Sequence, residues 1–179
     1  VRYEDNSLKT EPSLATSWER SLDGKTWTFH LRQNVTFQNG SQFDADAVLF
    51  TFERILNEKS PYFDLKIFKR GSYQYIEKLE KKDDFTVNFH LKYPVNSEIF
   101  LGNLTTATTM IVSPISFKTN SKSASSKPVG TGPFKFKAWE RGQKIILDAY
   151  EAHWRGKPKI NRLVIVVVKE NFLRILMLE

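Results

Sequence analysis

The chain has 179 residues, of which 40% are hydrophobic and 26% charged, with a formal net charge of +7 and no cysteine. This composition is typical of a globular protein large enough to bury a real core, and it excludes disulfides, thiolate metal sites and a cysteine nucleophile. No apolar run approaches the roughly 20 residues needed to span a bilayer. Because Lys and Arg are interspersed with acidic residues, the positive charge favours a solvated surface over a nucleic-acid interface.

The N-terminal part of the sequence begins with a predicted β-hairpin. The dipeptide Asp23-Gly24 is a strong turn signal, and strand-like runs lie on either side of it, at 14–19 and 26–31. Since successive strand residues point to opposite faces, the second run places its large apolar side chains together: Trp27, Phe29, Leu31. A further short strand is expected over 35–37, closed by a turn at Asn39-Gly40.

A helix is predicted next, with Asp44 as its N-cap and Asp46 in the first turn, where negative charge is favourable. Apolar residues recur at helical spacing and form one face: Val48, Phe52, Ile55, Leu56. The helix should end near Asn57. Residues 58–75 are expected to form a long connection with many aromatic residues: Tyr62, Phe63, Phe68, Tyr73, Tyr75. These rings could stack nucleic-acid bases, but core packing or an interdomain cleft accounts for them better.

The remaining sequence predicts strands, one short helix over 97–104 and a linker. Strands are expected over 76–82, 86–91, 134–138, 144–149 and 163–168. The last is rich in β-branched residues, which indicates a fully buried strand. Residues 116–129 are rich in Ser and Lys without periodicity, so we expect a loop or linker and a domain boundary there. A helical pattern starts at 170–179 without a cap, and we therefore expect an incomplete chain.

No catalytic constellation is visible in the sequence. The histidines do not have the spacing of a zinc-binding helix: His30, His90, His153. The carboxylate pairs Asp44/Asp46 and Asp83/Asp84 are explained by helix-capping and turn chemistry, and no serine lies in a nucleophile elbow. We therefore predict no catalytic residue, no metal site and no cofactor, and we do not expect an enzyme.

The motif at 130–133 consists of Gly130, Thr131, Gly132 and Pro133. It lacks the spacing of a phosphate-binding loop, and a strand is predicted after it, so no helix N-terminus is available to hold a phosphate. We interpret it as a tight crossover turn, in which glycine allows a positive φ and proline fixes φ.

Two long blocks carry a resemblance to a known family. LATSWERSLDGKTWTFHLRQNVTFQNGSQFDADAVLFTFERIL (14–56) and PVGTGPFKFKAWERGQKIILDAYEAHWRGKPKINRLVIVVV (128–168) resemble the signatures of peptide/nickel-type solute-binding proteins of bacterial ABC transporters, family 5. The stretch SPYFDLKIFKRGSYQY (60–75) is most similar to the dipeptide-binding and Sap-type branches. The resemblance covers nearly the whole chain.

This resemblance implies an α/β fold with mixed sheets, as a fragment of a two-lobe periplasmic-binding-protein-like structure. Residues 1–128 would be the extra small domain of the family, residues 129–179 part of the first lobe, and the second lobe would be absent. The implied function is to bind peptides and deliver them to permease subunits in the inner membrane. The protein would be periplasmic or lipid-anchored outside the cytoplasmic membrane, monomeric at full length, and without nucleic acid.

The resemblance also implies one ligand-facing residue and leaves alternatives open. Tyr62 matches a family aromatic that faces the ligand, although core packing would explain it equally well. Nickel-binding members use an arginine in the segment matching 104–110, where this chain has neither Arg nor Lys. His153 is the one hint of haem binding, so a haem or nickel-complex binder of the same family is the alternative. A nucleic-acid-binding domain is the alternative from a different class.

Overall fold

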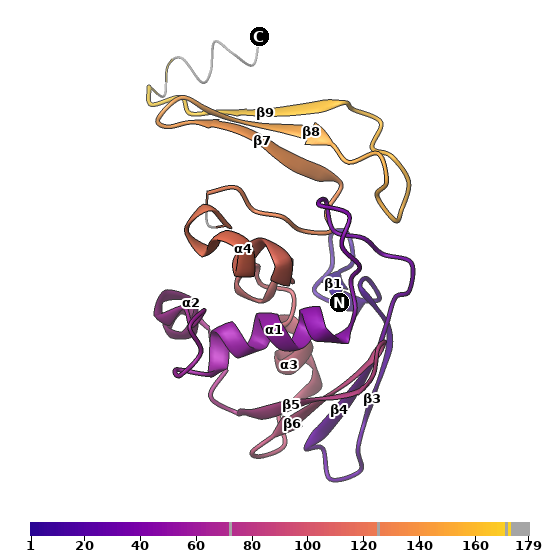
Figure 1. Ribbon diagram of the computed structural model, residues 1–179. Helices are drawn as coiled ribbons and strands as arrows, with labels where there is room; N and C mark the ends of the chain where they lie inside the picture. The colour runs from indigo at the N-terminus through magenta and orange to yellow at the C-terminus, as the bar shows by residue number, and fades with distance from the viewer. Residues whose placement is uncertain (72, 125, 171, 173–179) are drawn as a thin grey trace.

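The computed structural model describes residues 1–71, 73–124, 126–170 and 172, and its helices α1 to α4 lie between a four-stranded and a three-stranded antiparallel sheet (Figure 1). The short strands β1 and β2 pair with each other as a further, two-stranded sheet. This mixed α/β architecture confirms the predicted fold class. The strands are β1 (Arg2–Tyr3), β2 (Thr10–Glu11), β3 (Ala15–Arg20), β4 (Thr26–Leu31), β5 (Ile76–Asp83), β6 (Thr86–Leu91), β7 (Phe134–Glu140), β8 (Lys144–Ala149) and β9 (Arg162–Val166). The helices are α1 (Ala45–Leu56), α2 (Leu65–Arg70), α3 (Ser97–Asn103) and α4 (Pro114–Ala124), with a 3-10 turn at Ala107–Thr109.

The larger sheet has the strand order β3-β4-β6-β5 and is built from two hairpins. The predicted turn in the first hairpin is confirmed, because Gly24 adopts a φ of +70°, which only glycine tolerates without strain. The hairpins join through the antiparallel pair β4–β6, in which Phe29 lies opposite Val87. The sheet therefore depends on a pairing between segments far apart in the sequence.

The hydrophobic core lies between this sheet and the helices. The strand alternation is confirmed, because Trp27, Phe29 and Leu31 are all buried, and the next strand adds a second set from the same face: Val87, Phe89, Leu91. The predicted apolar face of α1 meets them through Val48, Phe52 and Ile55, which are buried, while Leu56 packs at its edge. Asp44 caps α1 as expected, its Oδ1 accepting a hydrogen bond from Ala47 N at 3.0 Å.

Three local predictions are wrong. Residues 114–124 form helix α4 where we expected a linker, because Ser113 accepts a hydrogen bond from Ser116 N at 3.4 Å and Pro114 opens the first turn. A second helix, α2, lies inside the predicted connection and is capped by Asp64, whose Oδ1 accepts from Lys66 N at 3.0 Å. The strand expected over 35–37 is reduced to an isolated bridge between Thr36 and Gln42.

The smaller sheet, β7-β8-β9, confirms three predicted strands but not the predicted burial of the last one. Val164, Ile165 and Val166 are 45%, 48% and 51% exposed. Nothing in the described part of the chain forms a second layer over these side chains, and burial of a strand requires one. The helical pattern expected at 170–179 lies outside the described residues except for positions 170 and 172. Among the described helices, none is long and apolar enough to cross a membrane.

Candidate functional site

Tyr62 lies in the connection between α1 and α2, in a turn that begins at Ser60. The Ser60 carbonyl accepts a hydrogen bond from Phe63 N at 3.1 Å, and the Ser60 hydroxyl accepts one from Tyr62 N at 3.3 Å. The Tyr62 side chain is half-buried, and its ring centroid lies 5.2 Å from that of Phe50 on α1. Its environment is therefore neither core nor open solvent, as expected for an aromatic residue at the wall of a binding site.

Tyr62 belongs, through its contact with Phe50, to a group of rings and cations that we call the aromatic–cation cluster: Phe50, Arg54, Tyr62, Phe117, Lys118. Phe117 of α4 lies 6.0 Å from Phe50, and the Arg54 guanidinium carbon lies 3.9 Å from the centroid of the Phe117 ring. The Lys118 ammonium lies 5.8 Å from the centre of Phe50. These cation–π contacts hold α4 against α1.

Arg54 is the electrostatic centre of the cluster. It is only 7% exposed, and its Nε has no hydrogen-bond partner among the described residues. Burial lowers the pKa of Arg54, while the Asp64 carboxylate acts in the opposite direction, yet the guanidinium stays protonated because its normal pKa is so high. The cluster thus carries positive charge next to an aromatic wall.

The sequence led us to Tyr62 but not to its partners on α4. Phe117 and Lys118 fall in the segment that we predicted as a linker. The signal that could have found them is Ser113-Pro114, an N-cap residue followed by proline at the first helical position. The structure does not bring Tyr62 into a described contact with the turn at 130–133.

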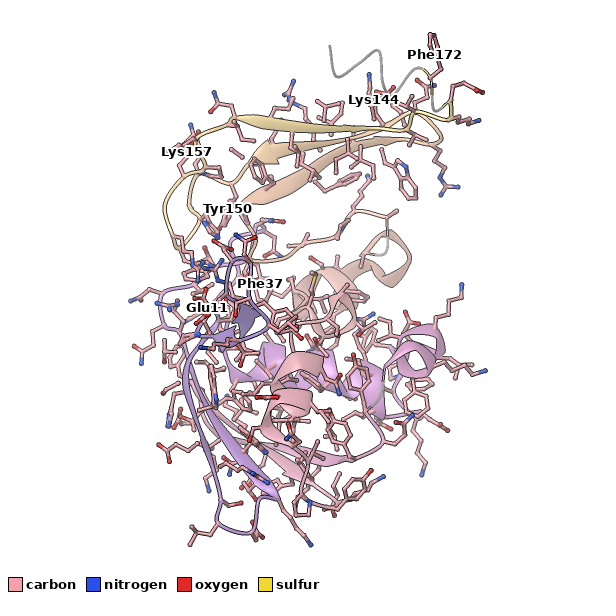
Figure 2. The ribbon with its side chains drawn as sticks, turned by 180° about the vertical axis from the view of Figure 1, so that it is seen from behind. Glu11, Phe37, Lys144, Tyr150, Lys157 and Phe172 are labelled. Atoms are coloured by element: carbon pink, nitrogen blue, oxygen red, sulfur yellow. The ribbon has the colours of Figure 1, made fainter. Side chains whose placement is uncertain are left out.

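The turn at 130–133 joins α4 to β7 and is held by Gln38. The Gln38 side chain donates to Gly132 O at 3.0 Å and Phe134 O at 2.9 Å, and it accepts from Gly130 N at 3.3 Å. Next to it, the Tyr150 hydroxyl donates to Phe37 O at 2.9 Å, and these two residues lie close together where the smaller sheet meets the rest of the protein (Figure 2). These bonds position the smaller sheet on the main core.

Replacing Gln38 by alanine should destabilise the protein by about 1–3 kcal/mol, because three side-chain hydrogen bonds at a partly buried junction are lost. Urea unfolding followed by circular dichroism measures the difference. The matched control is Gln42→Ala, since Gln42 is an exposed glutamine only four positions away. Equal stability of the two variants would show that Gln38 does not hold the turn.

The conformation of this turn differs from the predicted one. Positive φ angles occur at Gly24, Gly40, Gly142 and Gly156 among the described glycines, and not at Gly130 or Gly132. A Cβ atom at position 132 would meet nothing within 4 Å. The backbone conformation of the turn therefore does not require glycine at position 130 or 132. The role of the turn as a crossover stays a prediction.

Gly132→Ala should change the free energy of unfolding by less than about 0.5 kcal/mol, because the alanine Cβ has space and its φ is ordinary. Gly156→Ala should cost about 1–2 kcal/mol, because Gly156 has a φ of +93°. Thermal and urea unfolding of the two variants check this contrast. A larger loss for Gly132→Ala than for Gly156→Ala would contradict it.

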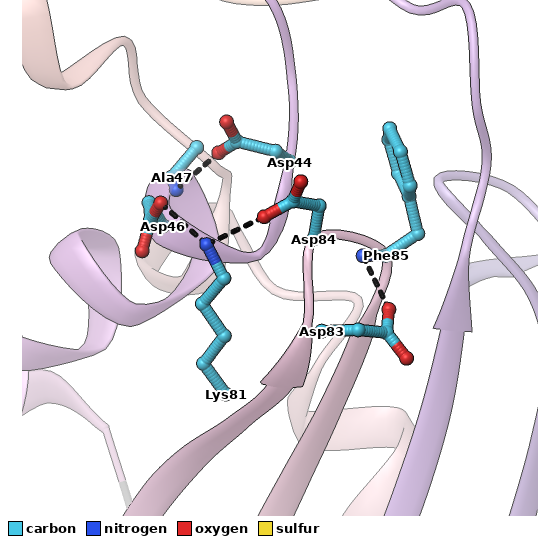
Figure 3. A network of polar contacts seen from close by, with 7 residues as sticks. All are labelled: Asp44, Asp46, Ala47, Lys81, Asp83, Asp84 and Phe85. Carbon is cyan, nitrogen blue, oxygen red and sulfur yellow. Dashed lines mark hydrogen bonds and ion pairs between the residues drawn. The ribbon is translucent and has the colours of Figure 1, made fainter.

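The remaining candidate groups have structural roles. Asp44 caps α1, Asp83 accepts from Phe85 N at 2.8 Å, and Lys81 bridges Asp46 and Asp84 at 2.8 Å each (Figure 3). The hydrogen bonds from the Lys81 ammonium to the Asp46 and Asp84 carboxylates stabilise its charged form and raise the pKa of Lys81. The helix-capping and turn interpretation of these carboxylates is confirmed.

The histidines lie apart from one another on the surface. His30 lies 3.6 Å from Glu19, His90 lies 2.9 Å from Glu80, and the His153 ring faces Gly156 O at 3.3 Å. Within the described residues, no group of three or more His, Asp or Glu side chains is arranged to hold a metal ion.

Residues 9–179 match the sequence model of the bacterial extracellular solute-binding proteins, family 5 middle region. The chain belongs to this family. Its family 5 relatives include the di/tripeptide-binding protein 2 of Pseudomonas aeruginosa, at 34% identity over 97% of this chain and 35% of the relative. They also include the heme-binding protein A of Haemophilus influenzae, at 34% identity over 95% of this chain and 34% of the relative.

The fold agrees with that of a solved family 5 structure. The periplasmic binding protein DppA from Helicobacter pylori, in complex with the peptide STSA, superposes with a TM-score of 0.86 at 32% identity. The match covers 99% of this chain and 38% of that structure. The chain therefore spans about a third of the length of the family 5 relatives that it matches, and these relatives are solute-binding transport proteins.

Proposed function

We propose that this chain is part of an extracytoplasmic solute-binding component of an ABC importer, which binds peptides and delivers them to a permease in the membrane. The observation that carries this proposal is the match of nearly the whole chain to family 5, together with the superposition on a peptide-bound relative. The protein would work in the periplasm or anchored by lipid outside the cytoplasmic membrane, as a monomer and without nucleic acid.

In this proposal the chain supplies one wall of a cleft. Residues 1–128 are the extra small domain and residues 129–179 part of the first lobe, with the turn at 130–133 as the crossover between them. A second lobe would close on the ligand by a hinge motion. Tyr62 would contact the peptide, because its half-buried ring is already oriented by Phe50 and loses little side-chain entropy on binding.

Tyr62→Ala should weaken peptide binding about tenfold, roughly 1.4 kcal/mol, because the ligand loses an aromatic contact. Tyr62→Phe should bind as the unmodified protein does, because the ring remains. Isothermal titration calorimetry of the full-length protein with the tetrapeptide Ser-Thr-Ser-Ala measures the change in affinity. Tyr93→Ala is the control, since Tyr93 is 56% exposed and outside the aromatic–cation cluster. Equal affinities for all variants would remove Tyr62 from the site.

Native mass spectrometry distinguishes the peptide proposal from the alternative within the family. The protein is purified under native conditions from the cells that make it, so that its own ligand is retained. An ensemble of peptide adducts supports the proposal, whereas a single haem-sized or metal-sized adduct would replace it. The heme-binding relative is as similar to this chain as the di/tripeptide-binding one, at 34% identity each. Sequence similarity therefore does not distinguish peptide from haem as the ligand, whereas the mass of the bound ligand does.

A further inference from the structure

Arg54 carries a buried positive charge that has no direct partner among the described residues. It is 7% exposed, and its Nε is completely buried without a hydrogen bond. The other two guanidinium nitrogens, Nη1 and Nη2, likewise form no hydrogen bond or ion pair with a described residue, but they are not completely buried. These two nitrogens are therefore the accessible part of a charge that lies mostly inside the protein.

Two nearby features offset only part of the cost of burying this charge. Arg54 lies in the last turn of α1, where the helix dipole favours a cation. The Asp64 carboxylate also acts on it electrostatically, but the two described side chains form no ion pair, and Asp64 Oδ1 accepts from Lys66 N and Ile67 N instead. Buried charges in proteins are normally both paired and hydrogen-bonded. An anionic partner is therefore missing at Arg54.

Packing of α4 against α1 does not explain a charge at position 54. An apolar side chain would contact Phe117 without the cost of taking a guanidinium out of water. The Arg54 guanidinium carbon lies 3.9 Å from the centroid of the Phe117 ring, and this cation–π contact supplies no oxygen acceptor for the N–H donors. The donors of Nη1 and Nη2 thus remain available for an anion.

A carboxylate matches these donors, because its two oxygens accept hydrogen bonds from an arginine side by side. Tyr62 belongs to the same cluster, and Lys118 adds an exposed second cation 5.8 Å from the centre of the Phe50 ring. We infer that Arg54 binds a carboxylate of the peptide ligand, with Lys118 as an auxiliary charge. This inference rests on the proposed function and specifies its ligand class, peptides with a C-terminal or side-chain carboxylate placed beside Tyr62.

Calorimetric titration of the full-length protein with two pairs of peptides tests the inference, since the members of each pair differ by one carboxylate. Ser-Thr-Ser-Ala and its C-terminal amide probe the terminal carboxylate, whereas the amides of Ser-Thr-Glu-Ala and Ser-Thr-Gln-Ala probe an acidic side chain. In one of the pairs, the peptide with the carboxylate should bind at least about tenfold more tightly, because it gains charged hydrogen bonds. Arg54→Gln should reduce this preference to less than about twofold, because the charged donors are lost.

Two further variants make the test specific. Arg20→Gln removes an arginine that also lies over a ring, 5.7 Å from the centre of Trp27, but is exposed on β3, and it should leave the preference unchanged. Lys118→Gln should reduce the preference about two- to threefold, because one nearby charge is lost, and its exposed position keeps the test valid if Arg54→Gln does not fold.

Three results would overturn the inference and leave the peptide proposal intact. They are equal binding within both pairs, a preference that survives Arg54→Gln, and, where that variant does not fold, a preference that Lys118→Gln leaves unchanged. Failure of all four peptides to bind the unmodified protein would count against the peptide proposal as well, so the two failures are distinguishable.

Discussion

Replacing Phe100 by alanine should lower the free energy of unfolding by about 3–5 kcal/mol, the range for removing a buried phenylalanine. Phe100 is fully buried at 0% exposure. Its ring packs 4.9 Å from Trp27 and 5.9 Å from Phe89, so it links the two central strands of the larger sheet to α3. The loss combines the transfer of the ring to water with a cavity that its rigid aromatic neighbours cannot refill.

The neighbouring residue on α3 provides the control for this prediction. Ile99 is 59% exposed, so Ile99→Ala should change stability by no more than about 0.5 kcal/mol. Denaturant unfolding monitored by tryptophan fluorescence reports both variants, because Trp27 lies against Phe100. Similar losses for the two substitutions would mean that α3 does not pack on the sheet through Phe100.

The isolated 179-residue chain should self-associate through its smaller sheet at micromolar concentration. Trp139, Ile145 and Ile165 lie in register across β7, β8 and β9, and Trp139 and Ile165 are 47% and 48% exposed. Contiguous exposed apolar surface of this kind drives association in water. Among the described residues β9 is an edge strand of its sheet, and edge strands can pair with another chain. Sedimentation velocity over a concentration series measures the association.

The double substitution Trp139→Lys/Ile165→Lys should raise the dissociation constant at least tenfold, because two charges would be buried in the contact. Leu22→Lys is the matched control, because Leu22 is a fully exposed apolar residue that stands alone in a turn. It should leave association unchanged. A chain that sediments as a monomer at every concentration would contradict the prediction, as would equal effects of Leu22→Lys and the double substitution.

Periodic signals in the sequence were sufficient for the main core. The strand alternation predicts that one set of side chains is buried, and the helical spacing predicts another: Trp27, Phe29, Leu31 and Val48, Phe52, Ile55. All six are buried in the structure. Such patterns are informative because an element with one face toward the core has its apolar residues on that face. Helix α4 carries no such spacing. It is held by its cap at Ser113 and by ring and cation contacts of Phe117 with α1, which depend on tertiary neighbours.

The candidate site and β9 show two further limits of prediction from pattern. Tyr62 was found through family resemblance, whereas Arg54 and Phe117 come together only in space, 63 positions apart along the chain. For β9, the β-branched composition indicates a strand suited to burial, but composition cannot supply the layer that would cover it. In β9, therefore, the residues' own propensity was enough to predict the strand, whereas their exposure depends on what packs against them.

The strand order β3-β4-β6-β5 also determines how the chain reaches this structure. Each hairpin closes locally and can form within microseconds, whereas the central pair must bring Thr28 and Asn88 together across 60 positions. Such non-local pairing is slow because the loop entropy is lost before the contacts form. The seam between β4 and β6 is therefore the kinetic bottleneck. Two polypeptides divided after α1 would each carry one complete hairpin, and they would reconstitute the protein along that seam.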